Sequence, residues 1–259
     1  TLPHKAKELD LAPSLKTIIA ITQEWTIAPE TRLSSAITES YNMLYDKIMH
    51  IEEILGFLKT KKPCFSEYGS VVIFGGTGLS YFKIWKDLIT FHQEDNLKFS
   101  NIFILGGDRT VNLTYDSLSL AEKYYPNYLT QPIDDKEILG CRHEMDVMNL
   151  ITPAIKRPDT LKGIPIEAVF TEKRCGSQAE TSDTIIQLLK TQKLSTQLPI
   201  LFLGTLPYIV RQGIQAKLLM PNYKVDTASI FEPYLETIET TLKGALPAAL
   251  YLDELHWFF

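Results

Sequence analysis

Cysteine is scarce in this sequence. Three cysteines, Cys64, Cys141 and Cys175, are spread over 259 residues. An odd number of widely spaced cysteines is not the pattern of a disulfide framework, and it favours a reducing compartment. We therefore expect a cytoplasmic protein that folds without covalent cross-links.

Clusters of basic residues are also missing. The 26 Lys and Arg residues are scattered along the chain and, with 31 Asp and Glu residues, leave a formal net charge of −5. Proteins that bind nucleic acid or anionic membranes carry a basic patch on one face or along one helix. The composition therefore argues against both and favours a small molecule as the partner.

Long apolar runs are absent as well. None reaches the roughly 20 residues that a helix needs to cross a bilayer. The N-terminus carries Lys5, Lys7, Glu8 and Asp10 where a signal peptide would need its apolar core. A transmembrane segment and a retained signal peptide are therefore not expected, whereas the sequence leaves open whether a leader preceded Thr1.

The hydrophobic content of 45% is sufficient for one large domain, or for one domain with an extension. Residues 1–63 are predicted to form a helical extension. Apolar side chains recur there at spacings of three, four and seven, at Ile37, Leu44, Ile48, Ile51, Leu55 and Leu58. A separate helical bundle is the alternative, but about 60 residues are marginal for an independent core, so we expect the extension to pack on the main domain.

Residues 64–259 are predicted to form an α/β domain. Five short apolar runs bounded by Gly, Pro or polar residues suit strands that are buried on both faces. These runs are Val71–Phe74, Ile102–Leu105, Ile166–Phe170, Pro199–Leu203 and Tyr223–Ala228. The apolar segment Leu246–Phe259 is predicted to be a docking helix that covers the core, with a partner-binding tail as the alternative.

Helical patterns separate the predicted strands. Apolar residues at intervals of three mark one helix, at Leu79, Phe82, Trp85 and Leu88, and a second pattern runs through Ile185 and Leu188. Strand and helix in regular alternation imply parallel strands with right-handed crossovers. The predicted fold class is therefore α/β, with a Rossmann-like, doubly wound, mostly parallel five-stranded sheet and an N-terminal helical extension.

Three of the predicted strands run directly into glycine, at Gly75-Gly76, Gly106-Gly107 and Gly204-Thr205. The carboxyl ends of parallel strands lie on one side of a sheet, so these turns should converge on one crevice at the switch in strand order. Glycine there lets backbone N–H groups approach an anionic ligand. For any single turn, the alternative is that glycine only makes a tight connection.

The first turn begins like a dinucleotide-binding fingerprint but does not complete it. Tyr81 stands where the third glycine belongs, and Asp108 follows about 30 residues later instead of about 20. A nicotinamide-dependent redox enzyme is therefore disfavoured.

Polar side chains gather ahead of a predicted helix at Arg142, His143, Glu144 and Asp146. The simpler account is a solvated helix start in which Arg142 and Asp146 form an ion pair one turn apart. Cys141 and His143 have no second pair of ligands at a zinc spacing, so no structural zinc site is predicted.

Two further segments are rich in hydrogen-bonding groups. Residues 171–183 lie between a predicted strand and a predicted helix, where some of the hydroxyl groups must serve as ordinary N-caps. After Thr205, Pro207 suits a first helical turn, which places Arg211 one turn inside the helix. From there a guanidinium group can bind an anion with two parallel hydrogen bonds.

The order of these motifs resembles the YdcF/SanA/ElyC family of bacterial α/β domains. In that family a first strand ends in Gly, a second ends in Ser-Gly-Gly, and a Glu-Ala pair opens a helix. Gly-Val-Pro, a Glu followed by Asn-Thr-x-Glu-Asn, and His-x-x-Arg come next. The matching positions lie between about residues 70 and 230, at Gly75-Gly76, Leu105-Gly106-Gly107, Glu144-Met145, Gly163-Ile164-Pro165, Glu172, Glu180-Thr181-Ser182-Asp183, and Thr205 with Tyr208-Ile209-Val210-Arg211.

The chain departs from this pattern at Glu180, at Asp183-Thr184 and at Tyr208, which replace the family's Asn, Glu-Asn and His. The resemblance implies a Rossmann-like domain that binds a nucleotide-like ligand, with Glu172 and Thr181 at the ligand. S-adenosylmethionine binding is associated with one branch of the family, and envelope lipid-carrier metabolism with another. The membrane-anchored branches carry a transmembrane segment for which this sequence has no apolar run.

Together these features predict a protein that binds a phosphate-bearing or nucleoside ligand and acts on it as a hydrolase or transferase. Glu144, with Asp108 beside it, is the predicted acid or base, because a partly desolvated carboxylate can be tuned toward neutral pH. S-adenosylmethionine is a candidate cofactor, and so is Mg²⁺, which paired carboxylates can hold against a phosphate. The residues expected to bind the ligand are Gly75, Gly76, Gly106, Gly107, Arg142, Glu172, Thr181, Thr205 and Arg211.

A non-catalytic module is the alternative. In that case the cleft binds a metabolite or nothing, and the two ends of the chain contact a protein partner. No nucleophile is indicated, because Ser177 lacks a Gly-x-Ser-x-Gly turn and Cys175 has no His nearby in the sequence. The substrate, the reaction, the oligomeric state and the pathway are not specified by the sequence.

Overall fold

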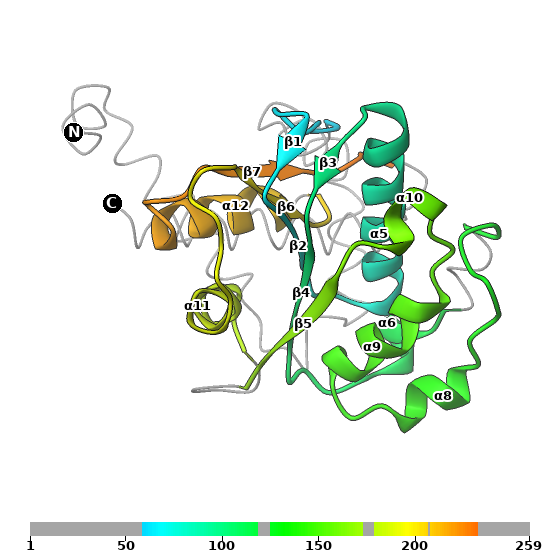
Figure 1. Cartoon of the computed structure of the whole chain (residues 1–259). Coiled ribbons are helices and arrows are strands. Elements are labelled where there is room, and N and C mark those ends of the chain that lie inside the picture. The colour runs from blue at the N-terminus through cyan, green and yellow to red at the C-terminus, as the bar shows by residue number, and fades with distance from the viewer. Residues whose placement is uncertain (1–58, 119–124, 173–178, 207, 233–259) are drawn as a thin grey trace, which may run out of the picture. The chain divides into compact units, whose positions relative to one another are not determined.

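The computed structural model describes residues 59–118, 125–172, 179–206 and 208–232 (Figure 1). The chain divides into two units, and nearly all of these residues belong to the second, which comprises Thr60–Thr205 and Ile209–Ile230. The helix expected around residues 37–58 and the docking helix expected over Leu246–Phe259 lie outside the described residues.

Strands and helices alternate along the described chain, as the sequence predicts. In chain order the elements are β1 (Glu67–Tyr68), β2 (Ser70–Phe74), α5 (Gly78–Glu94), β3 (Lys98–Phe99), β4 (Ile102–Gly107), α6 (Leu113–Asp116), α8 (Asp135–Gly140), α9 (Glu144–Ala154), α10 (Asp159–Lys162), β5 (Ile166–Thr171), α11 (Thr181–Thr191), β6 (Ile200–Leu203), α12 (Tyr208–Leu219) and β7 (Val225–Ala228).

Five strands form one parallel sheet in the order β5-β4-β2-β6-β7. The central strand is β2, in which Val71 is in register with Ile102 of β4 and with Leu201 of β6. The chain thus builds outward from β2 to β5, returns to the other side of β2, and builds outward again to β7. The predicted Rossmann-like, doubly wound sheet is confirmed, and its order reverses between β2 and β6.

Burial explains the apolar runs of β2, β4 and β6, holds for three of the four residues of β7, and fails for β5. Every residue of β2, β4 and β6 is buried, as expected for strands covered on both faces. The prediction of two buried faces is wrong for β5, where Glu167 and Ala168 are exposed and Phe170 is 39% exposed. This strand lies at the edge of the sheet and has a strand neighbour on one side only.

Helices lie on both faces of the sheet. Figure 1 shows α5 and α9 on one face, and α11 and α12 on the other. The predicted stripe of α5 is confirmed at Phe82, Trp85 and Leu88, which are buried, whereas Leu79 is half-buried. Ile185 and Leu188 of α11 are buried as well. Among the described helices, none is long and apolar enough to cross a membrane.

A second, two-stranded sheet was not predicted from the sequence. It joins β1 and β3 in parallel, with Glu67 opposite Lys98 and Tyr68 opposite Phe99. Two residues are too few for a periodic pattern, which explains why this sheet has no recognisable sequence signal.

Candidate functional site

The turns after β2 and β4 lie side by side. Phe74, the last residue of β2, is in register with Leu105 of β4, and the chain continues from them into Gly75 and Gly106. Because β6 also runs parallel to β2, its end at Gly204 and Thr205 lies on the same edge. The expected convergence of the glycine turns on one edge of the sheet follows from this register.

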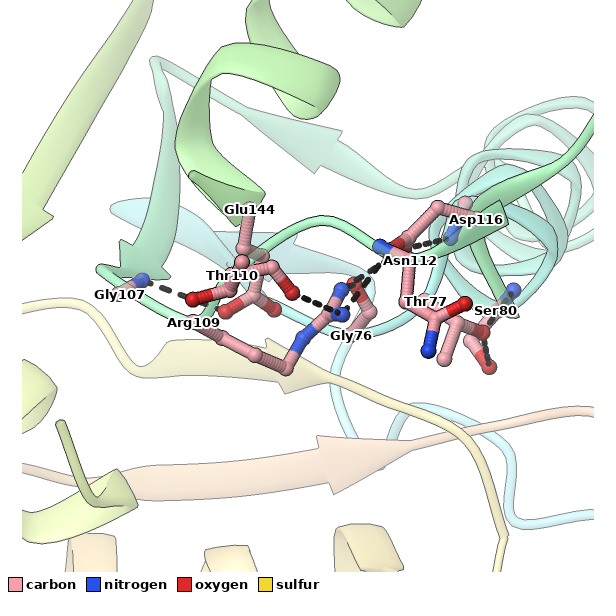
Figure 2. A network of polar contacts seen from close by, with 10 residues as sticks. Gly76, Thr77, Ser80, Gly107, Arg109, Thr110, Asn112, Asp116 and Glu144 are labelled. Carbon is pink, nitrogen blue, oxygen red and sulfur yellow. Dashed lines mark hydrogen bonds and ion pairs between the residues drawn. The ribbon is translucent and has the colours of Figure 1, made fainter. Parts of the chain in front are cut away.

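Glu144 is the first residue of α9, and its carboxylate reaches the first two turns (Figure 2). The backbone N–H of Gly107 donates to Glu144 Oε2 at 3.4 Å. A Cβ atom on Gly75 would lie 2.5 Å from Glu144 Oε1 and 2.8 Å from the carbonyl oxygen of Leu105. Glycine at position 75 is therefore what allows the carboxylate to occupy this place.

The start of α9 is tied to the loop that follows β4. Thr110 and His143 form an antiparallel bridge, and the backbone N–H of Glu144 donates to the Arg109 carbonyl oxygen at 2.9 Å. In the first turn of α9, Asp146 Oδ2 accepts the backbone N–H of His143 at 3.0 Å. These bonds satisfy N–H groups at the helix start and set the direction in which Glu144 enters the site.

Arg142 precedes α9 and is exposed. Its backbone N–H donates to Asp146 Oδ2 at 2.9 Å. The helical ion pair expected for Arg142 and Asp146 is wrong in that form, because the two residues do not share a helical turn.

Burial raises the pKa of Glu144 to about 7. The positive charge of Arg109 and the N–H groups of Gly107 and Gly76 oppose this shift, whereas the negative charge of Asp116 adds to it. A carboxyl group with such a pKa is present in both protonation states near neutral pH. It can therefore accept a proton or donate one at the strand ends.

Arg109 and Asp116 form a second polar unit beside Glu144. Arg109 Nη1 lies 3.0 Å from Asp116 Oδ2, and Arg109 Nη2 lies 2.8 Å from Asp116 Oδ1. The same guanidinium group donates to the carbonyl oxygens of Gly76 at 3.2 Å and Thr110 at 3.3 Å. The pair thereby joins the β2 turn to the loop after β4.

Neither residue of this pair was predicted from the sequence to belong to the site. Arg109 directly follows Gly106-Gly107-Asp108, so its place at a strand end was an available signal. Asp116 had no such signal, because it lies in the long connection between β4 and β5. The path of that connection brings it close to Arg109.

Asp108 points toward a different neighbour. Its Oδ1 accepts the backbone N–H of Ala179 at 3.1 Å, which ties the β4 turn to the segment ahead of α11. A Cβ atom on Gly107 would lie 3.3 Å from Ala179 Cβ and 3.7 Å from Glu144 Oε2. Gly107 thus lies between Ala179 and the Glu144 carboxylate.

Gly106 faces a helix. A Cβ atom on it would lie 2.7 Å from Met145 Cε and 3.0 Å from Met148 Sδ, both on α9. The absence of a side chain at Gly106 therefore serves the packing of α9 against β4.

The remaining predicted residues occupy other parts of the same edge. Glu172 follows β5 and is exposed, and Thr181 opens α11 with a half-buried side chain. The carbonyl oxygen of Thr205 accepts the N–H of Ile209 in α12 at 2.9 Å, and Arg211 is half-buried one turn later. Direct contact within the predicted set joins Glu144 to Gly75, Gly76 and Gly107.

Two of the carboxylates near Glu144 already have partners within the protein. Across residues 59–118, 125–172, 179–206 and 208–232, no three His, Cys, Asp or Glu side chains are grouped so that they could hold a metal ion. Asp108 is bonded to Ala179, and Asp116 is bonded to Arg109. The buried carboxyl group of Glu144, with its raised pKa, suits proton transfer.

Comparison with known proteins returns no relative. No family model matches the chain, and no curated protein or solved structure matches it either. Function is therefore argued from the site itself.

Proposed function

We propose that the carboxyl edge of the sheet, at the β2 and β4 turns, binds a nucleoside-like or phosphate-bearing small molecule, and that Glu144 exchanges a proton with it. The position of Glu144 carries the proposal. Its carboxyl group is buried against two glycine turns at the edge where doubly wound sheets bind their ligands.

The local charges support a chemical role for Glu144. Burial of a carboxylate destabilises a fold unless a cation and hydrogen bonds compensate for the lost water. The nearby cation, Arg109, is already bound to Asp116 through both terminal nitrogens. A buried acid with a strongly raised pKa at the ends of the strands is typical of a catalytic acid or base. Hydrolase and transferase reactions are among those that use such a group.

The resemblance to the YdcF/SanA/ElyC family supports the same class of ligand. The motif order that carries the resemblance includes Gly75-Gly76, Gly106-Gly107 and Glu144. S-adenosylmethionine, which is associated with one branch of that family, is accordingly a candidate ligand.

A thermal-shift panel tests the proposal. It contains nucleosides, nucleotides, sugar nucleotides and S-adenosylmethionine, each with and without Mg²⁺. A ligand present at one hundred times its Kd should stabilise the wild-type protein by about 2.7 kcal/mol. Any ligand that stabilises the protein is then incubated with it, and its conversion is followed by mass spectrometry.

The Glu144→Gln variant separates binding from chemistry. Glutamine keeps the shape of the side chain and loses its proton exchange, so we expect turnover to be lost while ligand stabilisation persists. Glu167→Gln, on the exposed face of β5, is the matched control and should behave as wild type. Turnover by Glu144→Gln at the wild-type rate would contradict the catalytic role, and stabilisation by no ligand would favour the non-catalytic module.

A further inference from the structure

The N-terminus of α5 is the position at which a doubly wound sheet usually holds a phosphate of its ligand. In this chain a carboxylate of the protein occupies that position. The N–H of Gly78, the first residue of α5, donates to Asp116 Oδ1 at 3.2 Å. The N–H of Ser80 donates to Thr77 Oγ1 at 3.3 Å. Two donors of the first turn are therefore already bonded to side chains.

The Asp116 carboxylate is itself held by further donors. Both terminal nitrogens of Arg109 bind it, and the N–H of Asn112 donates to its Oδ2 at 2.9 Å. With Gly78, this makes one donor for each of the roughly four lone-pair positions that a carboxylate offers. Asp116 is fully buried. Its carboxylate is thus held in a fixed place within the site (Figure 2).

The charges around the β2 turn oppose a second anion. The charge of Arg109 is paired with Asp116, and its other hydrogen bonds go to the carbonyl oxygens of Gly76 and Thr110. A phosphate arriving at this turn would meet the carboxyl groups of Asp116 and Glu144 and a cation that is already neutralised.

We infer that Asp116 is a specificity-determining residue, which takes the place of a ligand phosphate at α5 and restricts the β2 turn to a neutral or cationic part of the ligand. The ligand class that fits is a nucleoside or a cationic nucleoside derivative, rather than a dinucleotide whose pyrophosphate binds at α5. The choice of ligand class rests on the proposed function. The occupation of the anion position at α5 by Asp116 does not depend on that function.

Inorganic pyrophosphate is the probe for this inference. Its binding is measured by calorimetry at constant ionic strength for wild type, for Asp116→Asn and for Asp159→Asn. The last variant is the matched control, because it removes the same charge from a surface pair with Lys162, 2.7 Å away. We expect Asp116→Asn to bind pyrophosphate at least about tenfold more tightly than the other two, the factor that one charge-assisted hydrogen bond can supply. Equal affinities in all three folded proteins would overturn the inference.

A measurement on the wild-type protein covers the case in which Asp116→Asn does not fold. The ¹⁵N and ¹H shifts of the Gly78 amide are followed during a titration with pyrophosphate. We expect no change, because Asp116 keeps this N–H. A saturable change at Gly78 would show that the position accepts an external anion, and the inference would be wrong.

The two proposals fail separately. Wild-type protein that binds no nucleoside contradicts the proposed function and leaves the pyrophosphate result unchanged. Conversely, wild-type protein that binds a nucleotide through the Gly78 amide contradicts the specificity assigned to Asp116 and leaves the role of Glu144 standing.

Discussion

The surroundings of Glu144 disfavour the ionised form of its carboxyl group. Loss of water around the carboxyl group favours the neutral acid, whereas Arg109 and two backbone N–H groups favour the anion. The balance leaves its pKa at about 7, well above the ordinary value of 4.5. A raised pKa in the folded state means that the unfolded chain releases this proton more readily, so the stability of the protein depends on pH.

The first prediction concerns that dependence. Between pH 4.5 and about 7 the folded state keeps a proton that the unfolded state loses, so the contribution of Glu144 to stability falls as pH rises, by about 3 kcal/mol in total. Glu144→Gln removes this loss. We therefore expect the variant to gain stability relative to wild type as pH rises through this window, in urea unfolding at a series of pH values. A constant difference between the two proteins across the window would contradict the assignment.

A second prediction concerns Gly75. The Cβ atom of Gly75→Ala would lie 2.5 Å from Glu144 Oε1 and 2.8 Å from the Leu105 carbonyl oxygen, so Glu144 or the backbone must move. We expect a loss of about 1–3 kcal/mol in the free energy of unfolding. Gly163→Ala is the control, because nothing lies within 4 Å of its Cβ position and its φ of −85° suits alanine. Equal stabilities of the two variants would show that the contact at Gly75 is absent.

Neighbouring glycines that look alike in the sequence do different things. Gly75 admits a carboxylate, whereas Gly106 admits the methionines of α9. The sequence indicated that both follow a strand, but it carries no information on which side of the strand each one opens, because that depends on the helix packed there.

At the scale of elements, α5 begins where the β2 turn ends, and Thr77 is its N-cap. The Thr77 hydroxyl oxygen accepts the Ser80 N–H at 3.3 Å. Because an N-cap satisfies a donor that has no partner inside the helix, we expect Thr77→Ala to cost about 1 kcal/mol of stability. Thr77→Ser keeps the hydroxyl and serves as the control in thermal unfolding. A loss as large in Thr77→Ser as in Thr77→Ala would count against the cap.

Arg109 and Asp116 connect three elements, namely the β2 turn, the loop after β4, and α6. Arg109→Met leaves the fully buried Asp116 carboxylate without its cation, so we expect a loss of about 3 kcal/mol or more. Arg109→Met combined with Asp116→Leu removes both charges, and we expect it to be more stable than Arg109→Met alone. Urea unfolding of the two single variants and the double variant measures the coupling; additive effects would contradict it.

At the scale of the whole described unit, its first and last residues are joined. The backbone of Lys61 pairs with that of Ser229 in both directions, at 2.8 and 2.9 Å. Asp87 on α5 forms a buried ion pair with Lys83 at 2.7 Å and accepts the N–H of Ile230 at 2.9 Å. Burial raises the pKa of Asp87, and the charge of Lys83 opposes that shift.

The fifth prediction follows from this junction. Lys83→Met leaves Asp87 buried without its cation, so the pKa of Asp87 should rise further, and the loss of stability, about 3 kcal/mol near neutral pH, should shrink in acid. Lys62→Met, which breaks an exposed pair with Asp95, is the control and should change little. Urea unfolding at two pH values distinguishes them. A Lys83→Met loss that is the same at both would contradict a charged Asp87 in the folded protein.

Much of the fold follows from the chain alone. The five apolar runs form the five strands of the sheet, with ends that differ by at most a few residues, and the helical stripe of α5 is where its periodicity places it. The exposure of β5 does not follow, because an edge strand and a central strand can share one apolar pattern. The site follows only in part, since Glu144 and the glycine turns are recognisable, whereas Arg109 and Asp116 are not.

Local features follow from the sequence alone. They are the positions at which strands and helices begin, and the turns that carry glycine at the strand ends. These features depend on periodicity and turn chemistry within a few residues of each position. The contacts between charged groups, in contrast, depend on the tertiary structure. Asp116 reaches the start of α5 across 38 residues because the parallel register of β2 and β4 brings their turns together. Glu144 meets Gly107 across 37 residues because the bridge between Thr110 and His143 holds the start of α9 at the loop after β4. Contacts between residues so far apart in the chain depend on the fold, and they leave no local sequence pattern.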